Sequence, residues 1–138
     1  MSELERMSFS IEKPLADKFE RLVKKRKYSN RSEFLRDLIR DSLVAEQWES
    51  DKDVVATVTL IYDHHTRGLL DKLTHMQHHH HGKVMANTHV HLDHDLCAEM
   101  ILMKGKGNEL RKLADLLGQQ KGVVHAAISM SSTGRELK

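Results

Sequence analysis

The sequence predicts an α+β protein made of two parts, and three observations support this prediction. Arg6–Ile11 alternates polar and apolar residues and is followed by two segments with helical spacing. After residue 53, runs rich in β-branched residues alternate with helical patterns. The polar segment WESDKD, from Trp48 to Asp53, separates the two patterns. We therefore expect one domain at residues 1–48, a linker at 49–53 and a second domain at 54–138.

The first part begins with a predicted strand. Met7, Phe9 and Ile11 lie on one face of it, and the other face carries Arg6, Ser8 and Ser10. A unit of about fifty residues with one strand and two helices cannot bury enough apolar surface alone. Its single strand also leaves both edges unpaired. We therefore expect a second copy of the chain to pair with it, strand to strand.

Two amphipathic helices follow this strand. Pro14 lies where a first helical turn tolerates proline, and Leu15–Val23 shows helical spacing before the basic run KKRK. Asn30 followed by Glu33 has the form of a capping box. The apolar residues between Phe34 and Leu43 then mark the second helix.

The second part has the order strand, helix, strand, strand, helix, strand. The strands are predicted at Val54–Tyr62, Val84–Leu92, Ala98–Met103 and Val123–Met130. The helices are marked by Leu69–Met76 and Leu110–Leu117. This βαββαβ order is the ferredoxin-like arrangement, in which both helices cover one face of an antiparallel sheet.

The composition excludes several classes of function. The net charge of +2 over 138 residues does not by itself indicate a nucleic-acid binder. The N-terminus lacks a secretory apolar region, and no apolar run is long enough to span a bilayer. The single cysteine excludes an internal disulfide, which fits the cytoplasm. No nucleophile with a neighbouring base, carboxylate pair or phosphate loop is recognisable, so no enzyme is predicted.

A metal site is predicted between His78 and Cys97, where seven of the eleven histidines and the only cysteine lie. His89 and His91 are two apart on a strand, so their side chains share a face, with Cα atoms roughly 6.5–7 Å apart. The hairpin return brings Cys97 beside His91. Such donors suit zinc in tetrahedral geometry and copper or nickel in planar geometry. The alternative is a solvated strand face with a small buried cysteine.

The tetrad His78–His81 is expected to supply a fourth ligand, and the residues alone do not select one. The remaining histidines are interpreted as structural or solvated: His64, His65, His75, His94 and His125.

The first part also predicts DNA binding. A ribbon of two paired strands fits the major groove, where Arg6 can contact guanine and Ser8 and Ser10 can contact bases of either strand. Asn30 and Arg31 begin a helix whose backbone N–H groups can hold a phosphate. The alternative is an ordinary amphipathic edge strand followed by a solvated basic helix end.

These residues together resemble a known family. RMSFSIEKPLADKFERLVKKRKYSNRSEFLRDLIRDSL resembles a ribbon-helix-helix DNA-binding domain, and QHHHH…THVHLDHDLC…KG resembles the metal-binding domain of the nickel-responsive transcriptional regulators. The resemblance covers nearly the whole chain. It implies a homotetramer, a dimer of dimers with an ACT-like regulatory core, that represses genes for nickel uptake by binding double-stranded operator DNA when loaded with nickel.

The resemblance also implies roles for single residues. One square-planar Ni(II) per chain is held by His89, His91 and Cys97 and by His78 of a neighbouring chain. Glu33 and Asp37 match a second cation site of some members. The positions implied to read bases are Arg6, Ser8 and Ser10. The positions implied to support the ligands are Tyr62 and Glu99, whereas His94 is not carried over as a ligand.

Two other classes of protein share part of this pattern. A metal buffer would keep the histidine and cysteine site but has no use for the predicted ribbon. An antitoxin-like ribbon-helix-helix protein carries a disordered tail that wraps its partner, where this chain has an ordered βαββαβ pattern.

Overall fold

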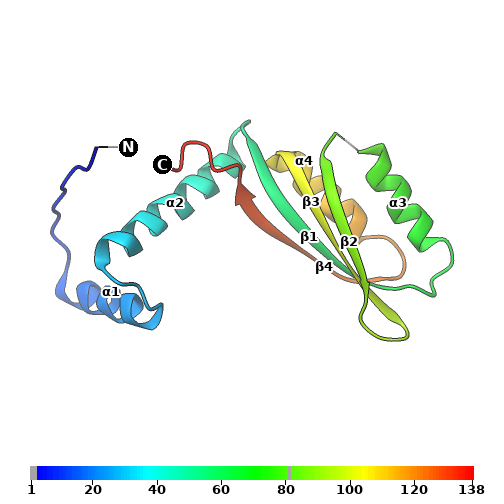
Figure 1. The fold of residues 1–138 in the computed structure, drawn as a ribbon, viewed down its shortest axis with the longest axis horizontal. Helices are drawn as coiled ribbons and strands as arrows, with labels where there is room; N and C mark the ends of the chain where they lie inside the picture. The colour runs from blue at the N-terminus through cyan, green and yellow to red at the C-terminus, as the bar shows by residue number, and fades with distance from the viewer. Residues whose placement is uncertain (1–2, 81) are drawn as a thin grey trace. The chain divides into compact units, whose positions relative to one another are not determined.

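The structure is a computed structural model that describes residues 3–80 and 82–138. It contains two compact units, one ending at Asp41 and the other spanning Ser42–Lys138. Helix α2, Arg31–Glu49, has residues in both units (Figure 1). None of the helices formed by the described residues is both long enough and apolar enough to cross a membrane.

The first unit contains α1, Lys13–Lys25, and the first part of α2. Its packing centres on Phe34, which is buried and whose ring lies 5.3 Å from that of Phe19 and 5.0 Å from that of Tyr28, centroid to centroid. Pro14 lies in the first turn of α1, as expected. Asn30 caps α2 because its Oδ1 accepts the Glu33 N–H at 2.9 Å, so the predicted helix start is confirmed.

The strand predicted at Arg6–Ile11 is not present in the single chain. The described residues before α1 form no regular element, and Met7 and Phe9 are exposed. A strand exists through hydrogen bonds to a neighbouring strand, and the described part of this chain places none beside this segment. The predicted strand was expected to pair with the same strand of a second copy, so it stays a prediction for the paired form.

The second unit has the predicted βαββαβ order and is α+β. Its strands are β1, Asp53–Asp63; β2, Val84–His91; β3, Leu96–Lys106; and β4, Val123–Ser132. Its helices, besides the end of α2, are α3, Leu69–His79, and α4, Gly107–Gly118. The sheet is antiparallel, with the strand order β2-β3-β1-β4 (Figure 1).

One face of this sheet forms the core. Alternate residues of β1 are fully buried, as period two requires for a strand with one covered face. They pack against Leu73 of α3 and Leu110 and Leu113 of α4, so both helices cover the same face. The core residues contributed by the two central strands are Val54, Ala56, Val58, Leu60, Tyr62, Cys97, Ile101 and Met103.

The end of α2 belongs to the second unit. Trp48 is buried in its core, and the indole N–H donates to the Ser131 carbonyl at 2.8 Å. The Gln47 amide donates to the Arg135 carbonyl at 3.0 Å. The sequence places Trp48 at the end of the first domain because its neighbours are polar, but the helix continues through it and the compact units separate between Asp41 and Ser42.

Candidate metal centre

The edge strand β2 presents His89 and His91 on the helix-covered face of the sheet. The register pairs His89 with Glu99 and His91 with Cys97, and residues directly opposite each other in an antiparallel pair share a face. Cys97 is also paired with Tyr62 of β1. The structure thus agrees with the placement that strand parity and the hairpin predict.

The donor atoms of His89, His91 and Cys97 all lie within 4.8 Å of one another. Cys97 is fully buried, both histidines are exposed, and His91 Nδ1 lies 3.2 Å from Cys97 Sγ. Burial raises the pKa of the Cys97 thiol, and the charge of Asp93 raises it further. A bound cation would reverse this preference, because a coordinating thiol is deprotonated.

This donor set fits a borderline divalent metal. Two imidazoles and a thiolate suit zinc, copper or nickel rather than magnesium or calcium, which prefer oxygen. The three donors found among the described residues are one short of a four-coordinate site, so they leave a position for one further ligand.

A network of hydrogen-bonded polar side chains lies next to the three donors and contacts His89. The Glu99 carboxylate is buried and accepts hydrogen bonds from Tyr62 Oη at 3.4 Å, from the Gln77 amide and from the Asn87 amide. Tyr62 Oη lies 3.5 Å from His89 Nδ1. Burial and then the Glu99 charge raise the pKa of Tyr62, so its hydroxyl keeps its proton and can donate. Contacts of this kind orient metal-binding imidazoles.

The sequence had indicated Tyr62 and Glu99 but missed Gln77 and Asn87. Amides are not typical metal ligands, so neither residue carries a metal signal. A weak signal was present nonetheless. Asn87 stands two residues before His89 on the same strand face, and Gln77 follows Leu73 on the buried side of α3.

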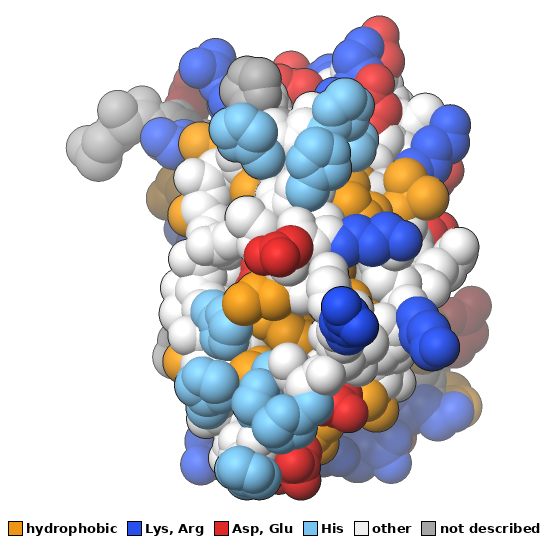
Figure 2. Space-filling view, turned by 90° about the vertical axis from the view of Figure 1, so that its right-hand side faces the viewer, with side chains coloured by type: hydrophobic (Ala, Val, Ile, Leu, Met, Phe, Trp, Pro, Cys, Tyr) orange, Lys and Arg blue, Asp and Glu red, His pale blue; other side chains and the backbone are white. Residues whose placement is uncertain are grey.

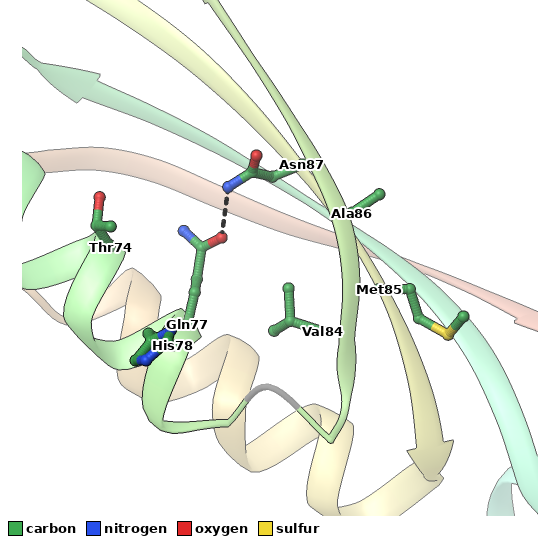
Figure 3. Close-up of a pocket in the computed structure, with 7 residues that line it drawn as sticks. All are labelled: Thr74, Gln77, His78, Val84, Met85, Ala86 and Asn87. Carbon is green, nitrogen blue, oxygen red and sulfur yellow. Dashed lines mark hydrogen bonds between the residues drawn. The ribbon is translucent and has the colours of Figure 1, made fainter.

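Figure 2 shows that histidine side chains gather in two groups on one face of the molecule. His78 lies in the last turn of α3 and is exposed. It borders a hollow of about 290 Å³ between α3 and β2, where Gln77 reaches across to Asn87 at 2.8 Å (Figure 3). His78 is not among the three converging donors of its own chain, and His81 lies outside the described residues.

The residues expected to contact DNA lie in the first unit. Arg6, Ser8 and Ser10 are exposed in the segment before α1. Asn30 serves as the cap of α2, and the Arg31 guanidinium pairs with Glu20.

The two carboxylates of the expected second cation site lie one turn apart on α2. Glu33 pairs with Arg36, and Asp37 pairs with Arg40 and accepts a hydrogen bond from Tyr28. In this structure both carboxylates are therefore paired with an arginine of the same helix.

Two families match adjacent stretches of the chain. The ribbon-helix-helix protein, copG family, matches residues 5–46, and the NikR C-terminal nickel-binding domain matches residues 55–131. A protein of Solibacter usitatus named as a nickel-responsive regulator is 49% identical over 100% of both chains. One of Geobacter sulfurreducens with the same name is 49% identical over 99% of both.

A solved structure agrees with the fold of the second unit. An uncharacterised protein from Thermotoga maritima superposes with a TM-score of 0.52 at 11% identity, covering 57% of this chain and 98% of that one. Such a likeness concerns the fold alone. The two family matches and the full-length relatives go further: the chain belongs to the family of nickel-responsive regulators, which are not enzymes and which join a ribbon-helix-helix DNA-binding domain to a nickel-binding domain.

Proposed function

We propose that this protein is a cytoplasmic nickel-dependent repressor. Loaded with one Ni(II) per chain, it binds double-stranded operator DNA as a homotetramer, a dimer of dimers, and controls genes for nickel uptake. The observation that carries the proposal is the convergence of His89, His91 and Cys97 in a chain whose first domain matches the ribbon-helix-helix family.

In the proposed centre, His89, His91 and Cys97 bind Ni(II) together with His78 of a second copy. The donor count supports this, because the described residues of one chain bring three donors together and His78 lies elsewhere, exposed at the end of α3. Three nitrogens and a thiolate in one plane suit nickel, whereas tetrahedral placement would suit zinc. The ion would thus join two subunits.

Self-association is supported by the uncovered face of the sheet. Residues that alternate with the core positions point away from α3 and α4, and Val90, Met100 and Leu102 are exposed there. An exposed apolar sheet face of this kind marks an interaction surface. In the first unit, exposed Met7 and Phe9 have the same character and suit strand pairing between two copies.

In the DNA complex, Arg6, Ser8 and Ser10 from two paired strands would read bases in the major groove. Asn30 and Arg31 at the start of α2 would hold a backbone phosphate, which positions the ribbon without reading sequence. Glu33 and Asp37 would hold a second cation in the DNA-bound form. That step requires them to exchange Arg36 and Arg40 for the ion.

Nickel controls DNA binding only through a difference in affinity between two arrangements of the protein. A ligand drawn from each of two chains supplies such a difference, because the four donors meet only when the copies are correctly placed. By thermodynamic reciprocity, operator DNA must tighten nickel binding by the same factor.

The proposal is tested by titrating operator DNA with the protein, with and without stoichiometric Ni(II). We expect nickel to tighten operator binding by the wild type and to have no effect on Cys97→Ala. Equal operator affinity with and without nickel would overturn the repressor mechanism and favour a metal buffer. As a second arm, Arg6→Ala should cost roughly 1–3 kcal/mol at the specific site and leave nickel binding intact.

A further inference from the structure

The residues that follow β4 form a strap over the end of α2. The strap, residues 133–136, lies beside the last turn of α2 (Figure 1). The Gln47 amide donates to the Arg135 carbonyl at 3.0 Å, and its oxygen accepts from the Ser132 hydroxyl at 2.7 Å. Gln47 is only 8% exposed, so both polar atoms of a buried amide depend on the strap and on the residue before it. A buried amide without partners is strongly unfavourable, so these bonds hold the last turn of α2 in place.

The strap is attached through polar contacts, and none of its four residues belongs to the core of the second unit. All four are exposed, and Glu136 forms an ion pair with Lys52, which follows α2. Glu136 has a φ of 64°, in the left-handed region that residues other than glycine rarely adopt, so its contacts must hold it there. A surface segment held by a few polar contacts opens at a lower free energy than the core does. The strap can therefore be released while the second unit stays folded.

Next to Gln47, the buried Trp48 lies against the first residue of α4. A Cβ atom at Gly107 would lie 2.7 Å from the Trp48 carbonyl oxygen and 2.9 Å from Cε3 of its ring, so only glycine leaves room for Trp48. The Arg111 guanidinium of α4 lies 5.3 Å from the centroid of the indole and pairs with Glu49 at 3.5 Å. The indole N–H donates to the Ser131 carbonyl at 2.8 Å. The end of α2 is therefore held between α4 on one side and the end of β4 with the strap on the other.

We propose that the strap anchors α2 to the nickel-binding unit and thereby lets nickel act on the DNA-binding unit. Helix α2 is unbroken from Arg31 to Glu49, and the compact units separate within it, between Asp41 and Ser42. A rigid element carries coupling between two sites only when its packing and hydrogen bonds hold it to both. Gln47 is thus a positioning residue, because it acts on DNA binding only through α2. The anchoring stands by itself, whereas the effect on DNA binding rests on the proposed function of a nickel-dependent repressor.

The anchoring is tested by fluorescence, because Trp48 is the only tryptophan of the chain. In Gln47→Ala, and in a variant that lacks residues 133–138, we expect emission at longer wavelength and stronger quenching by acrylamide than in the wild type. The thiolate-to-nickel absorption should remain in both variants, which shows that the second unit is folded. The matched control is Glu46→Ala, the same truncation at an exposed neighbouring position of α2, which should leave the fluorescence unchanged. Quenching equal to that of the wild type in both variants would overturn the proposal.

The effect on DNA binding is tested by titrating operator DNA with and without stoichiometric Ni(II). Gln47→Ala and the variant without residues 133–138 should bind nickel as tightly as the wild type and lose most of the tightening that nickel gives to operator binding. Gly107→Ala displaces Trp48 while the strap is unaltered, and it should show the same loss. A full nickel effect in variants whose Trp48 has become accessible would overturn the coupling role of the strap. A wild type that does not respond to nickel would count against the repressor function, and the quenching result would still decide whether the strap anchors α2.

Discussion

The two units of this chain use similar sequence patterns with different outcomes. Val54–Tyr62 and Arg6–Ile11 both alternate apolar residues with period two. The first pattern gives β1, because β3 and β4 lie on either side of it and the helices cover one face. The second gives no strand in one chain, and its apolar residues stay exposed. One unit therefore completes its core within the chain, whereas we propose that the other is completed by a second copy.

The largest expected effect concerns the self-contained core. Leu60 is fully buried in β1, so Leu60→Ala should lower the free energy of unfolding of the second unit by about 2–5 kcal/mol, from lost burial and the cavity left behind. Leu70→Ala is the matched control, since Leu70 is 46% exposed on α3. Denaturant unfolding measures both. Equal losses would show that this core is not closed within the chain.

In the first unit, we expect loss of an exposed apolar side chain to weaken the association of two copies. Phe9 is 64% exposed in one chain, and Phe9→Ala should weaken pairing of two copies by about 1.5–3 kcal/mol for each ring buried on association. Sedimentation over a range of protein concentrations measures this. Lys18→Ala, an exposed change on α1, serves as control. A dissociation constant unchanged by Phe9→Ala would contradict the need for a second copy.

The next largest effect is expected at Glu99, the buried carboxylate that lies next to the metal ligands, and it concerns nickel affinity. Glu99→Gln keeps the side-chain shape but replaces the charged carboxylate that accepts hydrogen bonds from Tyr62 and Gln77. It should weaken nickel binding by about 10–100-fold. Competition with a chelator of known affinity gives the value. Glu109→Gln removes an exposed carboxylate of α4 and should leave nickel affinity unchanged. Equal nickel affinities for the wild type and Glu99→Gln would show that Glu99 does not support nickel binding.

The smallest effect concerns the hairpin turn and depends on pH. Hydrogen bonds from the backbone N–H groups of Leu96 and Asp95 lower the pKa of Asp93. Because the folded pKa lies below the unfolded one, which is about 3.9, the stabilisation is present at neutral pH. It is lost as the pH falls through the folded pKa. Asp93→Ala should therefore unfold more easily than the wild type at neutral pH, and the difference should vanish in strong acid. A difference that persists there would contradict this cause.

Much of the fold could be predicted because hydrophobic period is a local property. The βαββαβ order and the shared face of His89 and His91 follow from it, and the hairpin adds Cys97. The rest depends on which segments meet in space. Trp48 begins the polar segment at which the first domain was expected to end, yet its indole is buried in the second unit and donates a hydrogen bond to the Ser131 carbonyl.

In the candidate site too, contacts between distant segments could not be predicted from the sequence. Gln77 and Asn87 support the centre through Glu99, which no spacing in the sequence reveals. The choice of His78 within its tetrad came from the resemblance to the nickel-responsive regulators. It stays a prediction, because it concerns a contact between two copies.

That contact can be tested directly by mixing two defective chains. A His78→Ala chain keeps His89, His91 and Cys97, and a Cys97→Ala chain keeps His78. We predict that each variant alone fails to give the thiolate absorption of planar nickel, and that the two co-expressed in one oligomer regain part of it. Absence of any recovery in the mixed oligomer, or full absorption in His78→Ala alone, would contradict a nickel centre shared between two copies of this chain.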